Sequence, residues 1–303
     1  MARYSSYAAA RRAQEQARLT VRWGGLQEFI GLPEALLNNL SLLGVPRHGL
    51  HYLLVLIALN YHHRYHKPYC PWPVVRASLR HLAGLTGLCR GAVRNMFECL
   101  ERADLLVHYR PAPTSQNRFD LLHLVKKVER LAGFERATGG HWTDRRRWPQ
   151  GGRFVRIPMA LIMLATEIGL RCRDLTTLLG LVLAGYEQTT WPIVTATRRS
   201  LVPFTGLQPI SIWGALHRLR EAGLLEFDLK HRPETYDLSP LISILLAAEK
   251  PPDDPSVSPD LRERLRRNRE WKAGLIERAG RNAPVPEERL PWVQERTVRV
   301  IIV

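Results

Sequence analysis

The sequence contains few cysteines, and their positions give no sign of a disulfide framework. No two of them have the spacing of a paired motif: they are Cys70, Cys89, Cys99 and Cys172. A chain of 303 residues with 45% hydrophobic content can bury a core without cross-links. We therefore expect a protein of a reducing compartment, the cytoplasm.

Long apolar runs are also missing. The most apolar stretch, 159–185, is interrupted by four charged residues, and charges at that density are costly in hydrocarbon. Residues 1–19 are rich in Ala and Arg but lack the apolar core of a secretory signal, which leaves an organellar transit peptide as the alternative. We expect no insertion into a membrane.

Signatures of catalysis are absent too. The sequence holds no Gly-x-x-x-x-Gly-Lys phosphate loop, and no nucleophile can be matched with a base. Tyr61 and Tyr65 have the spacing of the tyrosines in rolling-circle nucleases, but no His-x-His pair occurs to complete such a site. We expect neither catalytic activity nor a cofactor.

Acidic residues are scarce relative to basic ones. The chain has 28 Asp and Glu against 44 Lys and Arg, which gives a formal net charge of +16. A field of this sign attracts polyanions, and nucleic acid is the commonest soluble polyanion. A GC-rich genome would explain why Arg replaces Lys, but it would not explain the excess of cations. The charge balance therefore favours a nucleic-acid partner.

What the sequence does contain is an internal duplication. Residues 154–162 resemble residues 29–37, and the alignment continues without a gap to Tyr61 and Tyr186. One loop is six residues shorter in the second copy, and the alignment then resumes. It pairs Trp72-Pro73 with Trp191-Pro192 and Thr86-Gly87 with Thr205-Gly206. One unit of about ninety residues is therefore present twice.

One run in the first copy is rich in metal ligands. His62 and His66 are one helical turn apart, and Cys70 follows, so that a zinc site is an alternative interpretation. The second copy lacks this segment, and a basic aromatic loop needs no metal. We therefore expect no metal site.

Both copies predict the same order of elements. A short extended piece leads to an apolar helix with three-four spacing, then to a short helix that ends at a Thr-Gly pair, a third helix and two short strands. The predicted inner residues are Leu53, Leu54, Ile57 and Tyr61, with Leu178, Leu179, Val182 and Tyr186 in the copy, and Val93, Phe97, Leu100, Ile212, Leu216 and Leu219 in the third helices. The predicted strands are 105–110 and 118–124, and 224–230 and 235–238.

The residues around the second and third helices resemble winged helix-turn-helix domains. They are Leu82, Thr86-Gly87-Leu88, Val93, Leu100 and Ala103-Asp104-Leu105-Leu106, and the second copy is closer still at 219–225. The resemblance covers most of both copies. It implies a mainly α fold with small β wings, in two pseudo-symmetric winged helix-turn-helix domains. The tandem arrangement also resembles that of plasmid replication initiators, which bind repeated origin sites.

The expected division of the chain has five parts. They are a basic N-terminal helix (1–28), winged-helix domain 1 (29–125), a basic linker (126–153), winged-helix domain 2 (154–249), and a proline linker with a basic helix and a terminal strand (250–303). The basic helix, 260–281, has Leu261, Leu265, Trp271 and Leu275 as its predicted inner residues. The β-prone end, 298–303, is expected to pair with a sheet edge in this chain or in a second subunit.

The resemblance places the third helix of each copy in the major groove of DNA. In the first copy, the residues outside the core stripe are Arg90, Arg94 and Asn95. Arg binds O6 and N7 of guanine, and Asn binds N6 and N7 of adenine. The alternative is an ordinary solvated helix face. The equivalent residues of the second copy are Gln208, Ser211, Trp213, His217 and Arg218, of which Trp213 is either an interface anchor or packs against the wing.

Flanking basic residues are candidates for phosphate contacts, which add salt-dependent affinity without sequence information. Those before the two turns are Arg76, Arg80, His81, Arg198 and Arg199. Those of the wings, together with one amide, are Arg110, Asn117, Arg118, Lys230, His231 and Arg232. Between the copies, the expected minor-groove residues are Arg145, Arg146 and Arg147, with a solvated linker as the alternative.

These features predict a non-catalytic, sequence-specific double-stranded DNA-binding protein. The leading interpretation is a plasmid or phage replication initiator that binds origin repeats and recruits replication machinery. A transcriptional regulator that acts on transcription machinery is the alternative. Two recognition helices on one chain favour direct repeats, whereas a homodimer would require a palindrome. A third interpretation is a winged-helix protein-assembly module, which the neutral outward positions of the second copy favour and the arginines of the first oppose.

Overall fold

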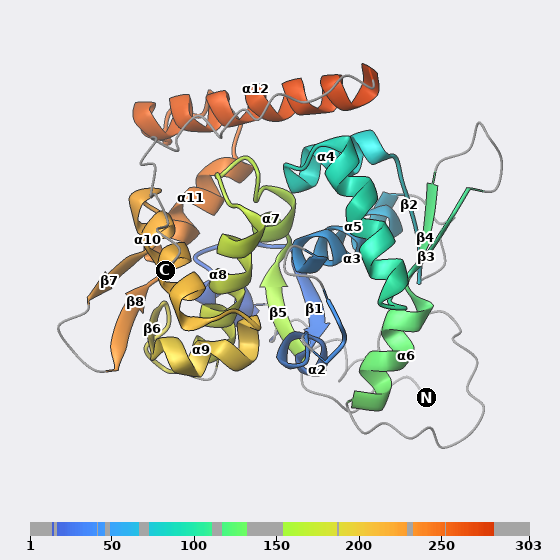
Figure 1. The fold of residues 1–303 in the computed structure, drawn as a ribbon. Coiled ribbons are helices and arrows are strands. Elements are labelled where there is room, and N and C mark those ends of the chain that lie inside the picture. The colour runs from blue at the N-terminus through green and yellow to red at the C-terminus, as the bar shows by residue number, and fades with distance from the viewer. Residues whose placement is uncertain are drawn as a thin grey trace, which may run out of the picture.

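The computed structural model describes residues 14, 17–40, 42–45, 49–66, 73–110, 117–131, 154–186, 188–228, 233–251 and 253–281. Within these ranges the chain is mainly helical, with one two-stranded and two three-stranded antiparallel sheets (Figure 1). No helix among the described residues combines the length and the apolarity that crossing a bilayer requires.

Two stretches of chain have the same element order. The first unit consists of β1 (Phe29–Pro33), α2 (Glu34–Asn38), α3 (Gly49–His66), β2 (Val74–Ala77), α4 (Leu79–Thr86), α5 (Arg90–Arg102), β3 (Val107–Tyr109), β4 (Asn117–Asp120) and α6 (Leu122–Leu131). The second unit consists of β5 (Phe154–Pro158), α7 (Met159–Met163), α8 (Cys172–Gly185), β6 (Ile193–Ala196), α9 (Arg198–Thr205), α10 (Pro209–Glu221), β7 (Glu226–Asp228), β8 (Glu234–Asp237) and α11 (Ser239–Glu249). A long helix, α12 (Pro259–Arg281), follows them.

The small sheets of the two units also pair in the same way. Their strand orders are β2-β4-β3 and β6-β8-β7. In the first, Phe119 of β4 lies between Val75 and His108. In the second, Tyr236 of β8 lies between Val194 and Phe227. Both central aromatic side chains are fully buried. The duplicated sequence therefore folds with the same strand register in both copies.

The turn between the second and third helices is built alike in both units. Ser78 caps α4 by accepting a hydrogen bond from the His81 amide at 3.1 Å, and Thr197 caps α9 in the same manner. Each helix ends at a glycine in the left-handed region, Gly87 with φ 67° and Gly206 with φ 62°. These positions favour glycine because a β-carbon is strained there. The sequence prediction of a tight turn at both Thr-Gly pairs is confirmed.

The predicted core stripes are buried. In the apolar helices this holds for Leu53, Leu54, Ile57, Leu178, Leu179 and Val182, and in the third helices for Val93, Phe97, Leu100, Ile212, Leu216 and Leu219. The three-four spacing therefore identified the inner face of α5 and α10. In α3 and α8 the prediction of one inner face was too narrow, because residues 50–60 and 174–182 are buried on every side.

One predicted strand is wrong in part. The stretch 118–124 leaves its strand at Asp120, whose Oδ1 accepts a hydrogen bond from the Leu122 amide at 2.9 Å and starts α6. Leu124, Val125 and Val128 then face the core, so that the helix extends to residue 131. It covers six residues of the range predicted as a linker. The equivalent helix α11 starts likewise, with Asp237 accepting from the Ser239 amide.

The two units pack directly against each other. Strands β1 and β5 form an antiparallel pair centred on Gly31 and Arg156, and α3 packs on both α7 and α8. The chain before β1 contacts the second unit: Arg22 donates to the Gly185 carbonyl at 2.6 Å, and Trp191 Nε1 donates to the Arg22 carbonyl at 2.7 Å. These contacts join the two copies into one body.

Helix α12 agrees with the predicted basic helix and contacts both units. Its Leu265 and Leu275 are buried, and the helix packs along α4 of the first unit (Figure 1). On the second unit, Asn268 donates to the Glu167 carbonyl at 2.6 Å and Arg264 donates to the Ala222 carbonyl at 2.6 Å. The helix therefore links the two units through contacts with both of them. The end of the chain, 298–303, lies outside the described residues.

Candidate nucleic-acid interface

Helix α5 presents a continuous polar stripe to solvent. Val93, Phe97 and Leu100 are buried on its inner side. The exposed residues, at the same spacing on the other side, are Gly91, Arg94, Asn95, Glu98 and Arg102. Of the predicted groove residues, Arg94 and Asn95 lie on this stripe and Arg90 is half-buried at the start of the helix. An Arg and an Asn side by side near the beginning of an exposed helix can reach base edges.

Two arginines face each other on the adjoining sheet. Arg76 of β2 lies directly opposite Arg118 of β4, and Tyr109 of β3 lies on the other side of Arg118. The neighbouring row, which contains Phe119, faces the core, so that the arginine row faces solvent. The Arg118 guanidinium lies 6.0 Å from the centre of the Tyr109 ring. Tyr109 is 39% exposed and was not singled out from the sequence, although alternation along its strand would have placed it outward.

The positive charges of the opposed arginines repel each other, and an anion bound next to them would reduce this repulsion. Like charges directly opposite on neighbouring strands are destabilising. A phosphate bound by the outer guanidinium nitrogens of the two arginines would offset this repulsion.

Other predicted contacts of the first unit surround these two features. Arg80 and His81 are exposed in the first turn of α4, which precedes α5. Arg110 is exposed just after β3, and Asn117 is half-exposed opposite Ala77 at the start of β4. The first unit therefore carries its predicted cations on α4, on the polar stripe of α5 and on the solvent face of the small sheet.

The equivalent helix of the second unit has a different surface. The Trp213 ring lies 4.1 Å from the His217 ring and 6.0 Å from the Phe227 ring of β7. The Arg198 guanidinium stacks over Trp213 at 4.7 Å. Of the two alternatives for Trp213, the described geometry has it packed against β7 of the small sheet. Partial burial lowers the pKa of His217, and nearby Arg220 lowers it further, so that this ring is neutral at neutral pH.

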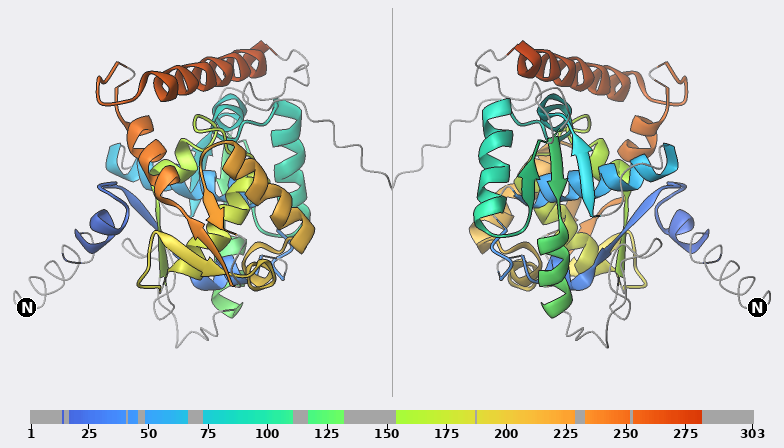
Figure 2. Two further views of the ribbon diagram at one scale, coloured as in Figure 1. Left: turned by 90° about the vertical axis from the view of Figure 1, so that its left-hand side faces the viewer. Right: turned by 90° about the vertical axis from the view of Figure 1, so that its right-hand side faces the viewer.

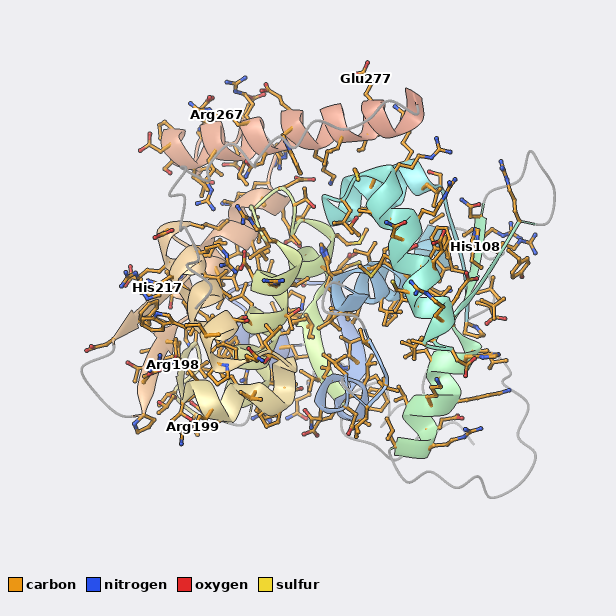
Figure 3. The ribbon with its side chains drawn as sticks, viewed as in Figure 1. His108, Arg198, Arg199, His217, Arg267 and Glu277 are labelled. Carbon is orange, nitrogen blue, oxygen red and sulfur yellow. The ribbon has the colours of Figure 1, made fainter. Side chains whose placement is uncertain are left out.

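Two arginines of the second unit that were predicted to contact DNA form ion pairs with carboxylates of this chain. Arg198 forms an ion pair with Glu234 at 3.1 Å, and Tyr236 also donates to that carboxylate. Arg218 forms an ion pair with Asp174 of α8 at 2.7 Å. Burial raises the pKa of Asp174, while the Arg218 guanidinium opposes this change. Figure 3 shows Arg198, Arg199 and His217 together on the flank of the second unit, opposite the flank that carries His108.

The solvent face of the small sheet is acidic in the second unit and carries the two opposed arginines in the first. Glu226 and Asp237 are paired across β7 and β8, and Asp228 follows on the same face beside Thr235. Glu226 and Asp228 are exposed, and Asp237 is half-exposed. In the places of Arg76 and Arg118 this sheet has the neutral pair Thr195 and Thr235, and the three carboxylates around that pair repel phosphate.

Some polar groups of the second unit do remain accessible near the start of α10. Gln208 and Arg199 are exposed, and Ser211 is half-exposed. Between Gln208 and Ser211, Ile210 is 71% exposed, an apolar residue that the sequence analysis did not single out. The alignment of the two copies could have identified it, because Ile210 aligns with Gly91, which lies on the exposed stripe of α5.

Several predicted residues lie outside the described residues. They are Arg145, Arg146, Arg147, Lys230, His231 and Arg232, and with them Cys70 and the side chains of His62 and His66. Among the residues whose side chains are described, no three His, Cys, Asp or Glu come together as a metal site.

Comparisons with protein-family models, with curated proteins and with solved structures give no match to this chain. The function is therefore argued from the chemistry of the two units alone.

Proposed function

We propose that this chain is a sequence-specific double-stranded DNA-binding protein and that its two units are winged helix-turn-helix domains. The element order supports the fold assignment, since each unit runs helix, strand, helix, tight turn, helix and then two further strands of one small sheet. In such a domain the helix after the tight turn enters the major groove. That helix is α5 in the first unit and α10 in the second.

The observation that carries the proposal is the opposed pair Arg76 and Arg118 on the solvent face of the sheet whose core face packs on α5. Two opposed arginines on the solvent face of one sheet favour a bound phosphate. Arg94 and Asn95 on the neighbouring helix supply the two side chains best suited to read guanine and adenine. Together they provide backbone anchoring and base readout on one unit.

A direct test is selection of bound fragments from the source genome at about 150 mM salt, where weak backbone-only binding is largely screened. We expect enrichment of a defined sequence. The double variant Arg94→Ala/Asn95→Ala should lose at least about tenfold of its preference for that sequence, because each bidentate contact contributes roughly 1–3 kcal/mol of discrimination.

Two controls separate base readout from charge. Arg267→Ala removes an exposed cation from α12, far from α5, and should leave the preference unchanged (Figure 3). Arg76→Ala/Arg118→Ala should weaken binding to all sequences alike and reduce the salt dependence by about two phosphate contacts. If the Arg94→Ala/Asn95→Ala variant kept both its affinity and its preference, the proposal would be wrong.

The enriched sequence also decides among the biological roles. A tandem array of sites beside an AT-rich stretch would support a plasmid or phage replication initiator, the role that we favour. A lone site before a gene would support a transcriptional regulator. The packed Trp213 and the acidic wing of the second unit favour a protein-assembly module as a further candidate, and this role would be supported if no sequence were enriched.

A further inference from the structure

The pairing of β1 with β5 has a special register. Gly31 pairs with Arg156, and in the duplicated sequence these two residues are equivalent, each being third in its strand. The first residue of each strand pairs with the last residue of the other, Phe29 with Pro158 and Phe154 with Pro33. When two equivalent antiparallel strands pair about equivalent residues, a half-turn about an axis between those residues maps one strand onto the other.

The same half-turn relates the other elements. In Figure 1, a rotation of 180° about the line of sight exchanges the positions of α2 and α7, of α4 and α9, of α6 and α11, and of the two wings. Helix α3 packs against its own equivalent, α8. Both views of Figure 2 show α5 and α10 on the same side of the molecule, the side that faces the viewer in Figure 1. The axis therefore emerges from the face that carries both helices.

A DNA duplex has local twofold axes perpendicular to its length. Two reading helices related by such an axis meet the two strands in opposite directions, as the two subunits of a symmetric dimer do on a palindrome. Two helices related by translation would meet a direct repeat instead. The sequence alone favoured direct repeats, and the register of β1 and β5 favours the inverted order.

The two half-sites cannot be alike. The first unit offers Arg94 and Asn95 to the bases and the Arg76 and Arg118 row to phosphates, whereas the second wing presents carboxylates. At the start of α10, the exposed Ile210 between Gln208 and Ser211 suits a thymine methyl group flanked by hydrogen-bonding base edges. The contacts of the second unit are therefore fewer and less dependent on salt.

The spacing of the half-sites is fixed by contacts between the units. Thr166 Oγ1 of the second unit donates to the Leu85 carbonyl of α4 at 2.8 Å. Helix α12 joins the same two regions, and Arg22 ties the chain before β1 to the second unit. Rotation of α5 relative to α10 would break these contacts.

We infer that one molecule binds one continuous duplex at two half-sites of opposite orientation and unequal strength, with α5 in the stronger and α10 in the weaker. This inference rests on the proposed DNA binding. It makes the binding site of a single chain an imperfect inverted repeat, and an array of direct repeats would then consist of whole sites of this kind.

The test starts from selection of random duplexes of about 30 base pairs, long enough for two half-sites centred about 10 base pairs apart. The full-length protein, Arg94→Ala/Asn95→Ala and Gln208→Ala/Ile210→Ala are selected in parallel. We expect the first variant to lose the stronger half-site and the second to lose the weaker one, with thermal unfolding confirming that both variants are folded. Replacing thymine by uracil in the weaker half-site should reproduce part of the effect of Ile210→Ala.

Three synthetic duplexes then compare the order of the half-sites. One carries the selected order, one has the weaker half-site reversed, and one has about five base pairs inserted between the halves, which moves them to opposite sides of the helix. Reversal and insertion should each lower the affinity at least about fivefold.

The outcomes distinguish the inference from the function on which it rests. Equal or tighter binding of the reversed duplex would overturn the inverted order. A selected sequence that ignores Gln208→Ala/Ile210→Ala would overturn the role of α10 while leaving DNA binding by α5 intact. If no sequence were selected at all, the proposed function would fail and this inference with it.

Discussion

Arg218 of α10 donates two hydrogen bonds to Asp174 of α8, from Nη2 at 2.7 Å and from Nε at 3.1 Å. The carboxylate is buried, with 6% of its side chain exposed, while the arginine is 35% exposed. The pair attaches the proposed second reading helix to the apolar helix beneath it. We therefore interpret Arg218, which the sequence placed among the DNA contacts, as a residue that positions α10.

Arg218→Ala should lower the free energy of unfolding by about 2–3 kcal/mol, because it leaves a buried carboxylate without its cation. Equilibrium urea unfolding measures this change. The matched control is Arg199→Ala, which removes an exposed cation of α9 and should change stability by less than about 0.5 kcal/mol while weakening DNA binding. If Arg218→Ala kept its stability but lost affinity for DNA, Arg218 would contact DNA and would not position α10.

The packing of α12 on α4 depends on Gly84. A β-carbon added there would lie 2.4 Å from Cγ1 of Ile276, too close for any real contact, whereas one added to Gly91 of α5 would meet nothing within 4 Å. Gly84→Ala should therefore lower stability by about 1–2 kcal/mol through overpacking. Gly91→Ala should leave it unchanged or raise it by up to about 1 kcal/mol. Hydrogen exchange should show faster exchange in α12 for Gly84→Ala alone, and equal behaviour of the two variants would contradict the packing.

Glu167 links α12 to the second unit through two cations. Its carboxylate accepts from Lys272 at 2.6 Å and from Arg269 at 3.0 Å, and all three side chains are largely buried. Glu167→Gln should cost about 1–3 kcal/mol, since both cations lose their counter-ion in a region of low solvent access. Glu270→Gln, which breaks the exposed pair with Arg266, should cost less than about 0.5 kcal/mol in the same urea experiment. Equal losses would show that Glu167 contributes no more than a surface pair.

The sequence predicted three helices and two strands in each unit because these depend on local spacing, but it missed β2, β6, α6 and α11. Apolar residues three and four apart identified the buried stripes of α5 and α10, and the Thr-Gly pairs identified both tight turns. Helices α3 and α8 are buried on every side, which depends on the packing of the two units. The duplication strengthened each prediction, since the same spacing of apolar residues and of Thr-Gly pairs occurs in both copies. The error at 118–124 is of the same local kind: its apolar residues suit a strand and a helix alike, and the Asp120 cap decides between them.

The candidate site was harder to predict because it depends on pairings between distant residues. Arg76 and Arg118 become neighbours only through the register of β2 and β4. Arg198 and Arg218 read as free cations in the sequence, but Glu234 and Asp174 reach them from other elements. The half-turn that we infer between the units likewise depends on which residues of β1 and β5 meet. Each of these relations is a product of tertiary packing, which the spacing of residues along the chain does not encode directly.

Acid should weaken the contact between the two units through His51. This residue of α3 is fully buried and hydrogen-bonds the backbone of Ile162 in α7, and burial lowers its pKa to about 4. In the unfolded chain the same group titrates near 6.5, so that the neutral ring stabilises the fold completely above that pH. As the pH falls from about 6.5 towards 4, His51 is protonated in the unfolded chain but stays neutral in the folded chain. The free energy of unfolding therefore falls by up to about 3 kcal/mol. Urea unfolding at several pH values in this window should therefore show a steeper decline for the natural protein than for His51→Gln, which has no group to titrate there. The difference between the two curves cancels other groups such as His217, and parallel curves would show that the pKa of His51 is the same in the folded and the unfolded chain.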